Sequence, residues 1–174
     1  ADVGVIVHNV GTAYAVHRAL RHGEPLIRRL VTVAGAAVAA PRNVEVLIGT
    51  PLSHLIESCG GLIREPVRIV MGGPMMGLVM PSLDVPVIKG TSGVLALTAA
   101  ETEEEQAGPC LRCGACVEAC PVGLMPFEIA ARVGTGDLPA AAALGVEDCI
   151  SCGSCGYVCP SSVPLVQLFA HAKG

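Results

Sequence analysis

The pattern of apolar and polar residues changes from helical to strand-like along the first hundred positions. Residues 12–22 carry apolar side chains at near-helical spacing, with Ala13, Val16 and Leu20 on one side and arginines on the other. Gly23 follows this predicted helix as a stop signal. After it, runs rich in β-branched residues predict strands over residues 30–35, 44–49, 67–71, 85–88 and 93–97.

A second helix is predicted after the strand at residues 44–49. Thr50 is expected to be its N-cap, and Pro51 is expected to lie in its first turn. Its apolar stripe consists of Leu52, Leu55, Ile56 and Cys59. We therefore interpret Cys59 as a buried core thiol, because a free cysteine behaves as a small apolar side chain.

Several short strands around one helix predict a β-grasp-like α+β unit. The segment at residues 72–77 is rich in glycine and follows a predicted strand. It lacks both common phosphate-binding patterns, GxGxxG and GK[ST]. We therefore predict a tight turn there, with a ligand-binding loop as the alternative.

The second half of the chain is predicted to be mainly helical. Helices are expected to begin at Pro126, near Asp137 and at Pro164, because apolar residues follow these positions at helical spacing. The acidic run at residues 101–105 is interpreted as a linker, an exposed helix start or simply surface. We predict an α+β domain at 1–100, including the N-terminal helical segment, and a mainly helical domain at 101–174.

Composition and charge restrict the kinds of core and partner that we expect. Hydrophobic residues make up 52% of the chain and aromatic residues only 2%, so the predicted cores are aliphatic. No uninterrupted apolar stretch reaches the roughly 18 residues of a membrane-spanning helix, and no transmembrane segment is predicted. Residues 91–174 hold three Lys and Arg against nine Asp and Glu, which argues against a nucleic-acid partner. The sequence begins without methionine, and we expect it to be a fragment of a longer protein.

Eight of the nine cysteines form two copies of the spacing C-x2-C-x2-C-x3-C-P. The first copy contains Cys110, Cys113, Cys116 and Cys120, and the second contains Cys149, Cys152, Cys155 and Cys159. This spacing is typical of bacterial ferredoxins that hold two [4Fe–4S] clusters. The first three cysteines of a copy wrap the backbone around one cluster, whereas the fourth points away and ligates the other cluster.

The spacing therefore predicts a crossed pair of metal sites. The first cluster is expected on Cys110, Cys113, Cys116 and Cys159, and the second on Cys149, Cys152, Cys155 and Cys120. Zinc and disulfides are the alternatives. A zinc ribbon would leave the third and fourth cysteines of each copy unexplained, and disulfides suit secreted domains, for which no signal-like segment is seen. Thiolate clusters also imply a reducing compartment.

Longer stretches of the sequence resemble one protein family over essentially the whole chain. They are residues 7–16 (VHNVGTAYAV), 23–25 (GEP), 31–35 (VTVAG), 48–51 (IGTP), 71–77 (MGGPMMG) and both cysteine motifs. These segments are similar to the RnfC family, called RsxC in some bacteria. That family is the peripheral subunit of the Rnf ion-translocating electron transport complex.

The resemblance implies a small β-grasp-like domain of SLBB type, followed by a mainly helical ferredoxin domain with two [4Fe–4S] clusters. It implies that electrons pass between an upstream site, which binds flavin and NADH, and partners in the membrane. The complex would belong to the translocase class. FMN and NADH would belong to an upstream domain of the intact subunit, and this fragment alone would only carry electrons. The expected location is peripheral, at the cytoplasmic face of the bacterial inner membrane, among other subunits of a membrane redox complex.

One residue of the N-terminal segment has two interpretations. The flavoprotein subunit of respiratory complex I, a related protein, places an asparagine pair near its flavin just before a helix. Residues 8 and 9 match that stretch, with His8 in place of the first asparagine. Asn9 is therefore expected to contact FMN in the intact protein, or to be a turn or cap residue.

Two other functions are compatible with the same sequence. A cobalamin-reductase-type protein of diol-degrading bacteria would share the flavin and iron–sulfur architecture. A partner-binding module would use its β-grasp half for docking, and its clusters would be structural. Such structural clusters would show no reversible reduction in the physiological range of reduction potentials.

Overall fold

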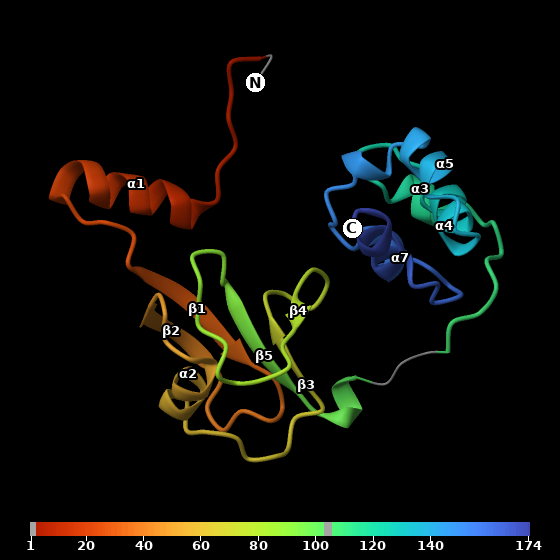
Figure 1. The fold of residues 1–174 in the computed structure, drawn as a ribbon. Coiled ribbons are helices and arrows are strands. Elements are labelled where there is room, and N and C mark those ends of the chain that lie inside the picture. The colour runs from red at the N-terminus through yellow and green to blue at the C-terminus, as the bar shows by residue number, and fades with distance from the viewer. Residues whose placement is uncertain (1–2, 103–105) are drawn as a thin grey trace. The chain divides into compact units, whose positions relative to one another are not determined.

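The computed structural model of the protein describes residues 3–102 and 106–174 (Figure 1). The chain divides into two compact units. The first comprises residues 1–72 and 79–101, and the second comprises residues 73–78 and 102–174. The predicted acidic linker falls partly at residues 103–105, which lie outside the described residues. The division into domains at 1–100 and 101–174 stays a prediction.

The first unit contains a five-stranded mixed sheet in the order β2-β1-β5-β3-β4 (Figure 1). Strand β1 pairs with β5 in parallel, whereas the β1–β2 and β3–β5 pairs are antiparallel. The strands are β1 (Arg28–Ala34), β2 (Arg42–Leu47), β3 (Arg68–Met71), β4 (Leu78–Val79) and β5 (Gly93–Leu97). Four of the five predicted strands are thus confirmed, with small shifts at their ends.

The fifth predicted strand, at residues 85–88, is wrong. This segment forms only an isolated bridge between Pro51 and Pro86. Its backbone instead pairs with the start of the neighbouring helix, where Val87 accepts from the Gly49 N–H at 2.8 Å and Val85 accepts from the Leu52 N–H at 3.0 Å. Pro86 lacks an N–H and cannot donate to a ladder, which explains why the β-branched run does not extend the sheet.

Helix α2 (Leu52–Ser58) packs its apolar stripe into the core of the first unit. Leu52, Leu55 and Ile56 are buried there against Val31 and Val33 of β1 and Val94 and Ala96 of β5. The N-cap is Pro51 and not the predicted Thr50, and no side chain caps the helix. Cys59 is the C-cap and is fully buried, which agrees with its interpretation as a core thiol.

A short turn after β5 is hydrogen-bonded to the segment that follows β1. This 3-10 helix, η1 (Ala99–Glu101), ends at the carboxylate of Glu101. That carboxylate accepts from the backbone N–H of Thr98 at 2.9 Å and from the N–H of Ala36 at 3.0 Å. Hydrogen bonding with these two amides lowers the pKa of Glu101. The first residue of the acidic run therefore belongs to the fold of the first unit.

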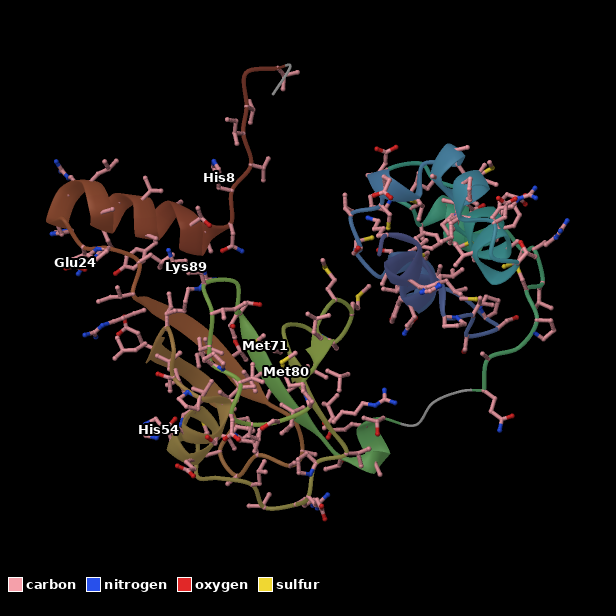
Figure 2. The ribbon with its side chains drawn as sticks, in the orientation of Figure 1. His8, Glu24, His54, Met71, Met80 and Lys89 are labelled. Atoms are coloured by element: carbon pink, nitrogen blue, oxygen red, sulfur yellow. The ribbon has the colours of Figure 1, made fainter. Side chains whose placement is uncertain are left out.

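Helix α1 (Val10–His22) confirms the predicted N-terminal helix. The side chain of Asn9 caps it by accepting the Gly11 N–H at 2.8 Å, and Gly23 ends it in the left-handed conformation. Arg18 pairs with Glu24, which lies beyond the helix end (Figure 2). Within the described part of the chain, none of the α1 side chains is buried. The helix is thus held by its caps and local contacts.

The glycine-rich segment after β3 contains the predicted turn, at residues 74–76. Its Gly77 N–H donates to the Gly73 carbonyl at 2.7 Å. Just before this segment lies Met71 (Figure 2), and its sulfur accepts a hydrogen bond from the Thr91 hydroxyl at 3.3 Å. His8 lies before α1 and His54 lies on α2 (Figure 2), whereas His17 and His22 both lie on α1 with their ring centroids 5.8 Å apart.

The second unit is helical. Its helices are α3 (Ala115–Glu118), α4 (Pro126–Gly134), α5 (Leu138–Ala143), η2 (Val146–Asp148), α6 (Ser154–Tyr157) and α7 (Leu165–Ala172). The three predicted helices appear as α4, α5 and α7, whereas the short α3 and α6 lie inside the cysteine motifs and were not predicted. The core consists mainly of Ile129, Val133, Val146, Leu165 and Phe169. No helix among the described residues is long and apolar enough to cross a membrane.

Candidate iron–sulfur sites

The two cysteine motifs fold as two copies of one backbone structure. Each residue n of the first motif corresponds to residue n+39 of the second, so that Cys110 matches Cys149. Arg112 and Ser151, at equivalent positions, have φ angles of 53° and 54°. Gly114 and Gly153 likewise have φ angles of 83° and 81°. Left-handed residues turn the chain sharply, so each motif bends at the same two points.

Each copy also directs backbone amides at equivalent sulfur atoms. The N–H of Arg112 donates to Sγ of Cys110, and the N–H of Ser151 donates to Sγ of Cys149, both at 3.4 Å. The fourth cysteines accept in the same way. Sγ of Cys120 accepts from Leu124 at 3.3 Å, and Sγ of Cys159 accepts from Val163 at 3.4 Å. Such hydrogen bonds stabilise negative charge on sulfur, as a cluster-bound thiolate requires.

The first cavity, called site 1 below, has about 360 Å³ of empty space that is partly open to solvent. Its four cysteines are Cys110, Cys113, Cys116 and Cys159. Phe127 and Leu165 add apolar wall to the cavity. Three thiols of the first motif are thus brought together with the fourth thiol of the second motif.

The second cavity, called site 2 below, has about 420 Å³ of empty space, also partly open to solvent. Its four cysteines are Cys120, Cys149, Cys152 and Cys155. Phe169 and Val166 form part of its apolar wall. The arrangement mirrors that of site 1, with the fourth thiol supplied by the first motif.

The residues of both sites fit a thiolate-ligated cluster. Each cavity presents four thiols, an apolar wall and amides aimed at sulfur, which are the features that hold a [4Fe–4S] cluster. All nine cysteines are free thiols in the structure. In residues 3–102 and 106–174, no three His, Cys, Asp or Glu side chains converge closely enough to bind a single metal ion.

Burial and hydrogen bonding change the thiol pKa values unequally. Desolvation raises the pKa of Cys116 in site 1 and of Cys155 in site 2, the third cysteine of each motif. The pKa of Cys152 is lowered because hydrogen bonding with the Ser154 side chain favours its thiolate. The equivalent residue of Ser154 in the first motif is Ala115, which has no hydroxyl.

The two sites also differ in exposure and in nearby charge. Cys110 and Cys113 of site 1 are exposed, whereas their equivalents in site 2 are half-buried. At site 2, the ammonium of Lys173 donates to the backbone carbonyl of Cys149 at 2.5 Å.

Sequence reasoning missed both Ser154 and Lys173. Superposing the two motifs would have identified Ser154, whereas the position of Lys173 required the fold.

The other candidate residues lie outside the two cavities. Cys59 belongs to the core of the first unit. Asn9 caps α1, and its expected contact with FMN in the intact protein stays a prediction. The cavity residues therefore come from the cysteine motifs and the helices that follow them.

Comparison with known proteins identifies both halves of the chain. A family model described as SLBB domain matches residues 30–79, and one described as 4Fe-4S dicluster domain matches residues 109–163. Together with the mixed sheet and the helical second unit, these matches confirm the predicted α+β fold class.

Several curated relatives match most or all of the chain. A relative from Rhodobacter capsulatus, named as the C subunit of an ion-translocating oxidoreductase complex, is 58% identical over 100% of this chain and 34% of its own length. A relative of the same name from Erwinia tasmaniensis is 47% identical over 99% of the chain and 22% of its own length.

A relative with a more specific name comes from Clostridium ljungdahlii. It is named as the C subunit of a proton-translocating ferredoxin:NAD(+) oxidoreductase complex, and it is 47% identical over 72% of this chain and 28% of its own length. The chain thus spans about a third or less of the length of these relatives. The matches confirm the resemblance to the RnfC family: the chain belongs to the family of C subunits of ion-translocating oxidoreductase complexes.

Proposed function

We propose that this chain holds two [4Fe–4S] clusters by crossed ligation. Cys110, Cys113, Cys116 and Cys159 would bind one cluster at site 1, and Cys149, Cys152, Cys155 and Cys120 would bind the other at site 2. The observation that carries this proposal is the composition of the two cavities, each lined by three thiols of one motif and one of the other. The match to the 4Fe-4S dicluster domain supports iron–sulfur clusters as the bound groups.

We further propose that the chain relays single electrons within an ion-translocating oxidoreductase complex. A bound [4Fe–4S] cluster supplies one-electron redox chemistry. The contribution of the chain is to hold each cluster by four thiolates, to shield it with apolar walls and to stabilise its negative charge with backbone amides. The names of the relatives, all from ion-translocating oxidoreductase complexes, support this setting.

The partners and location are inferred from the same relatives. We propose that the electrons are exchanged with a flavin and NADH site in the intact subunit and with other subunits of a membrane redox complex. In that setting the chain would lie peripherally at the cytoplasmic face of the bacterial inner membrane. Asn9, whose side chain caps α1, would contact FMN in the intact subunit.

An anaerobic redox titration of the cluster-loaded chain tests the relay directly. We expect dithionite to reduce two one-electron centres reversibly, as followed by electron paramagnetic resonance (EPR) spectroscopy. NADH alone should leave the visible absorbance of the clusters unchanged, because we place the flavin and NADH site outside these residues. Clusters without reversible reduction would favour a partner-binding module with structural clusters. Bleaching by NADH alone would place a nicotinamide or flavin site within this chain.

A further inference from the structure

Sites 1 and 2 share one backbone frame but differ in the polar groups around their cysteines. The first difference is a hydroxyl. Oγ of Ser154 lies 3.4 Å from Sγ of Cys152, a distance suited to a hydrogen bond with sulfur. Ser154 is the first residue of α6, and the equivalent first residue of α3 is Ala115. One proposed ligand of site 2 therefore has a hydroxyl partner that its counterpart Cys113 cannot have from the equivalent position.

The second difference is a fixed positive charge. Lys173 follows α7, and its half-buried ammonium donates across the unit to the carbonyl of Cys149. The equivalent position in the first half of the repeat is Gly134, the last residue of α4, which has no side chain. The hydrogen bond anchors the cation at the backbone of the first cysteine of the second motif.

The remaining charges near the two motifs have a weaker electrostatic effect on the sites. Glu147 and Asp148 precede Cys149, but both are exposed, and water and salt screen exposed charges. Arg112 lines site 1, but it is also exposed. The described residues that line site 2 are uncharged. Glu128 follows Phe127 of site 1 and is also half-buried, but Arg132 neutralises it in an ion pair. Lys173 is half-buried and hydrogen-bonded to the backbone of a motif cysteine.

Hydrogen bonds to cluster sulfurs and nearby positive charge both favour the reduced form, because reduction adds negative charge. We propose that Ser154 and Lys173 are positioning residues that raise the reduction potential of a cluster held at site 2 above that of a cluster held at site 1. This inference rests on the proposed function, since it requires a reducible cluster at each site. It assigns site 2 as the preferred position of a single electron added to the pair.

The greater burial of site 2 opposes this effect, because removing water from a charged group disfavours added charge. The variants below leave that burial unchanged, so they isolate the contributions of the hydroxyl and the ammonium. Ser154→Ala gives the second motif the residue of the first. Ala115→Ser is the reciprocal change and gives the first motif the residue of the second. Lys173→Gln keeps an N–H donor and removes the charge, whereas Lys173→Arg keeps both.

The experiment is an anaerobic potentiometric titration of the cluster-loaded chain, followed by EPR, at low and high salt. Cys113→Ser and Cys152→Ser identify the signals of sites 1 and 2. Arg132→Gln is the charge control, because Arg132 pairs with Glu128 on the surface of α4 and its loss removes one positive charge. Iron content and circular dichroism verify that each variant is folded and loaded.

We expect site 2 to be reduced first in the unaltered chain. Lys173→Gln should lower the equilibrium constant for reduction at site 2 by about tenfold, which is about 59 mV for a one-electron couple. Ser154→Ala should lower the same constant several-fold, and Ala115→Ser should raise that of site 1. Lys173→Arg should retain the original potential, and Arg132→Gln should shift neither site selectively.

Three results would overturn the inference while the proposed function stands. The first is a pair in which site 1 is reduced first. The second is an unchanged site 2 potential in Ser154→Ala. The third is an unchanged site 2 potential in Lys173→Gln, with or without a loss of stability or cluster content, which would show that the role of Lys173 is purely structural. An unaltered chain that holds fewer than two clusters would overturn the proposed function and this inference together.

Discussion

Site 1 and site 2 are made by the same local backbone, yet they present different surroundings to a bound cluster. Their left-handed residues, amide–sulfur hydrogen bonds and crossed thiols correspond position by position. Their side chains do not: site 1 has Ala115 and two exposed thiols, whereas site 2 has Ser154, Lys173 and half-buried thiols. We infer that the repeated backbone positions the ligands of each site, whereas the unrepeated side chains would set the energy of a bound cluster.

The largest expected effect concerns the crossed ligands. Cys120→Ala should abolish or damage the cluster at site 2, although Cys120 belongs to the first motif, because its thiol lines the second cavity. Cys159→Ala should do the same at site 1. EPR spectra and iron content of these variants are compared with those of Cys113→Ala and Cys152→Ala. If Cys120→Ala matches Cys113→Ala and not Cys152→Ala, the ligation is not crossed.

The wall of site 2 should contribute more stability than the wall of site 1. Phe169 is 3% exposed and packs in the helical core, whereas Phe127 of site 1 is half-buried. Phe169→Ala should destabilise the second unit by about 3–5 kcal/mol, and Phe127→Ala by less. Thermal unfolding of the two loaded variants measures the difference. Equal losses would show that the two walls are energetically equivalent.

The ninth cysteine is the control for the other eight. Cys59 is fully buried in the first unit, away from both cavities. Cys59→Ala should cost about 1–2 kcal/mol of stability through the lost packing and leave the iron content and EPR spectra unchanged. Chemical denaturation and iron analysis test the two parts separately. Loss of either cluster would show that the core assignment of Cys59 is wrong.

The smallest expected effect tests whether the two backbones are equally strained. Arg112→Gly and Ser151→Gly relieve left-handed strain at equivalent φ angles and increase the entropy of the unfolded chain. These effects oppose each other, so each variant should change stability by less than about 1 kcal/mol, and by similar amounts. If the unfolding midpoints of Arg112→Gly and Ser151→Gly move in opposite directions, the two motifs do not share one backbone conformation.

The cysteine sites could be predicted from sequence because the spacing itself carries the geometry. The spacing of cysteines within each motif is enough to predict the eight ligand positions and the crossed ligation. The strand at 93–97 was predicted with its bounds, since it is an apolar run that begins at a glycine. Long-range pairing explains the failures. Residues 85–88 have strand-like composition, but their carbonyls accept from Gly49 and Leu52 near the start of α2.

The residues that distinguish the two sites were harder to predict. Ser154 becomes conspicuous only when the motifs are superposed and Ala115 occupies its place. Lys173 lies 24 positions from Cys149, and only the packing of α7 brings its ammonium to that carbonyl. The sequence therefore predicts what binds, whereas the folded structure is needed to compare the energies of the two sites.

Iron and acid-labile sulfide analysis of the anaerobically purified chain, with Mössbauer spectroscopy to identify the cluster type, decides whether both sites hold clusters. Two [4Fe–4S] clusters predict about eight irons and eight sulfides per chain, all in cubane-type spectra. A stable content of about four irons under anaerobic handling, or zinc in place of iron, would contradict two crossed cluster sites.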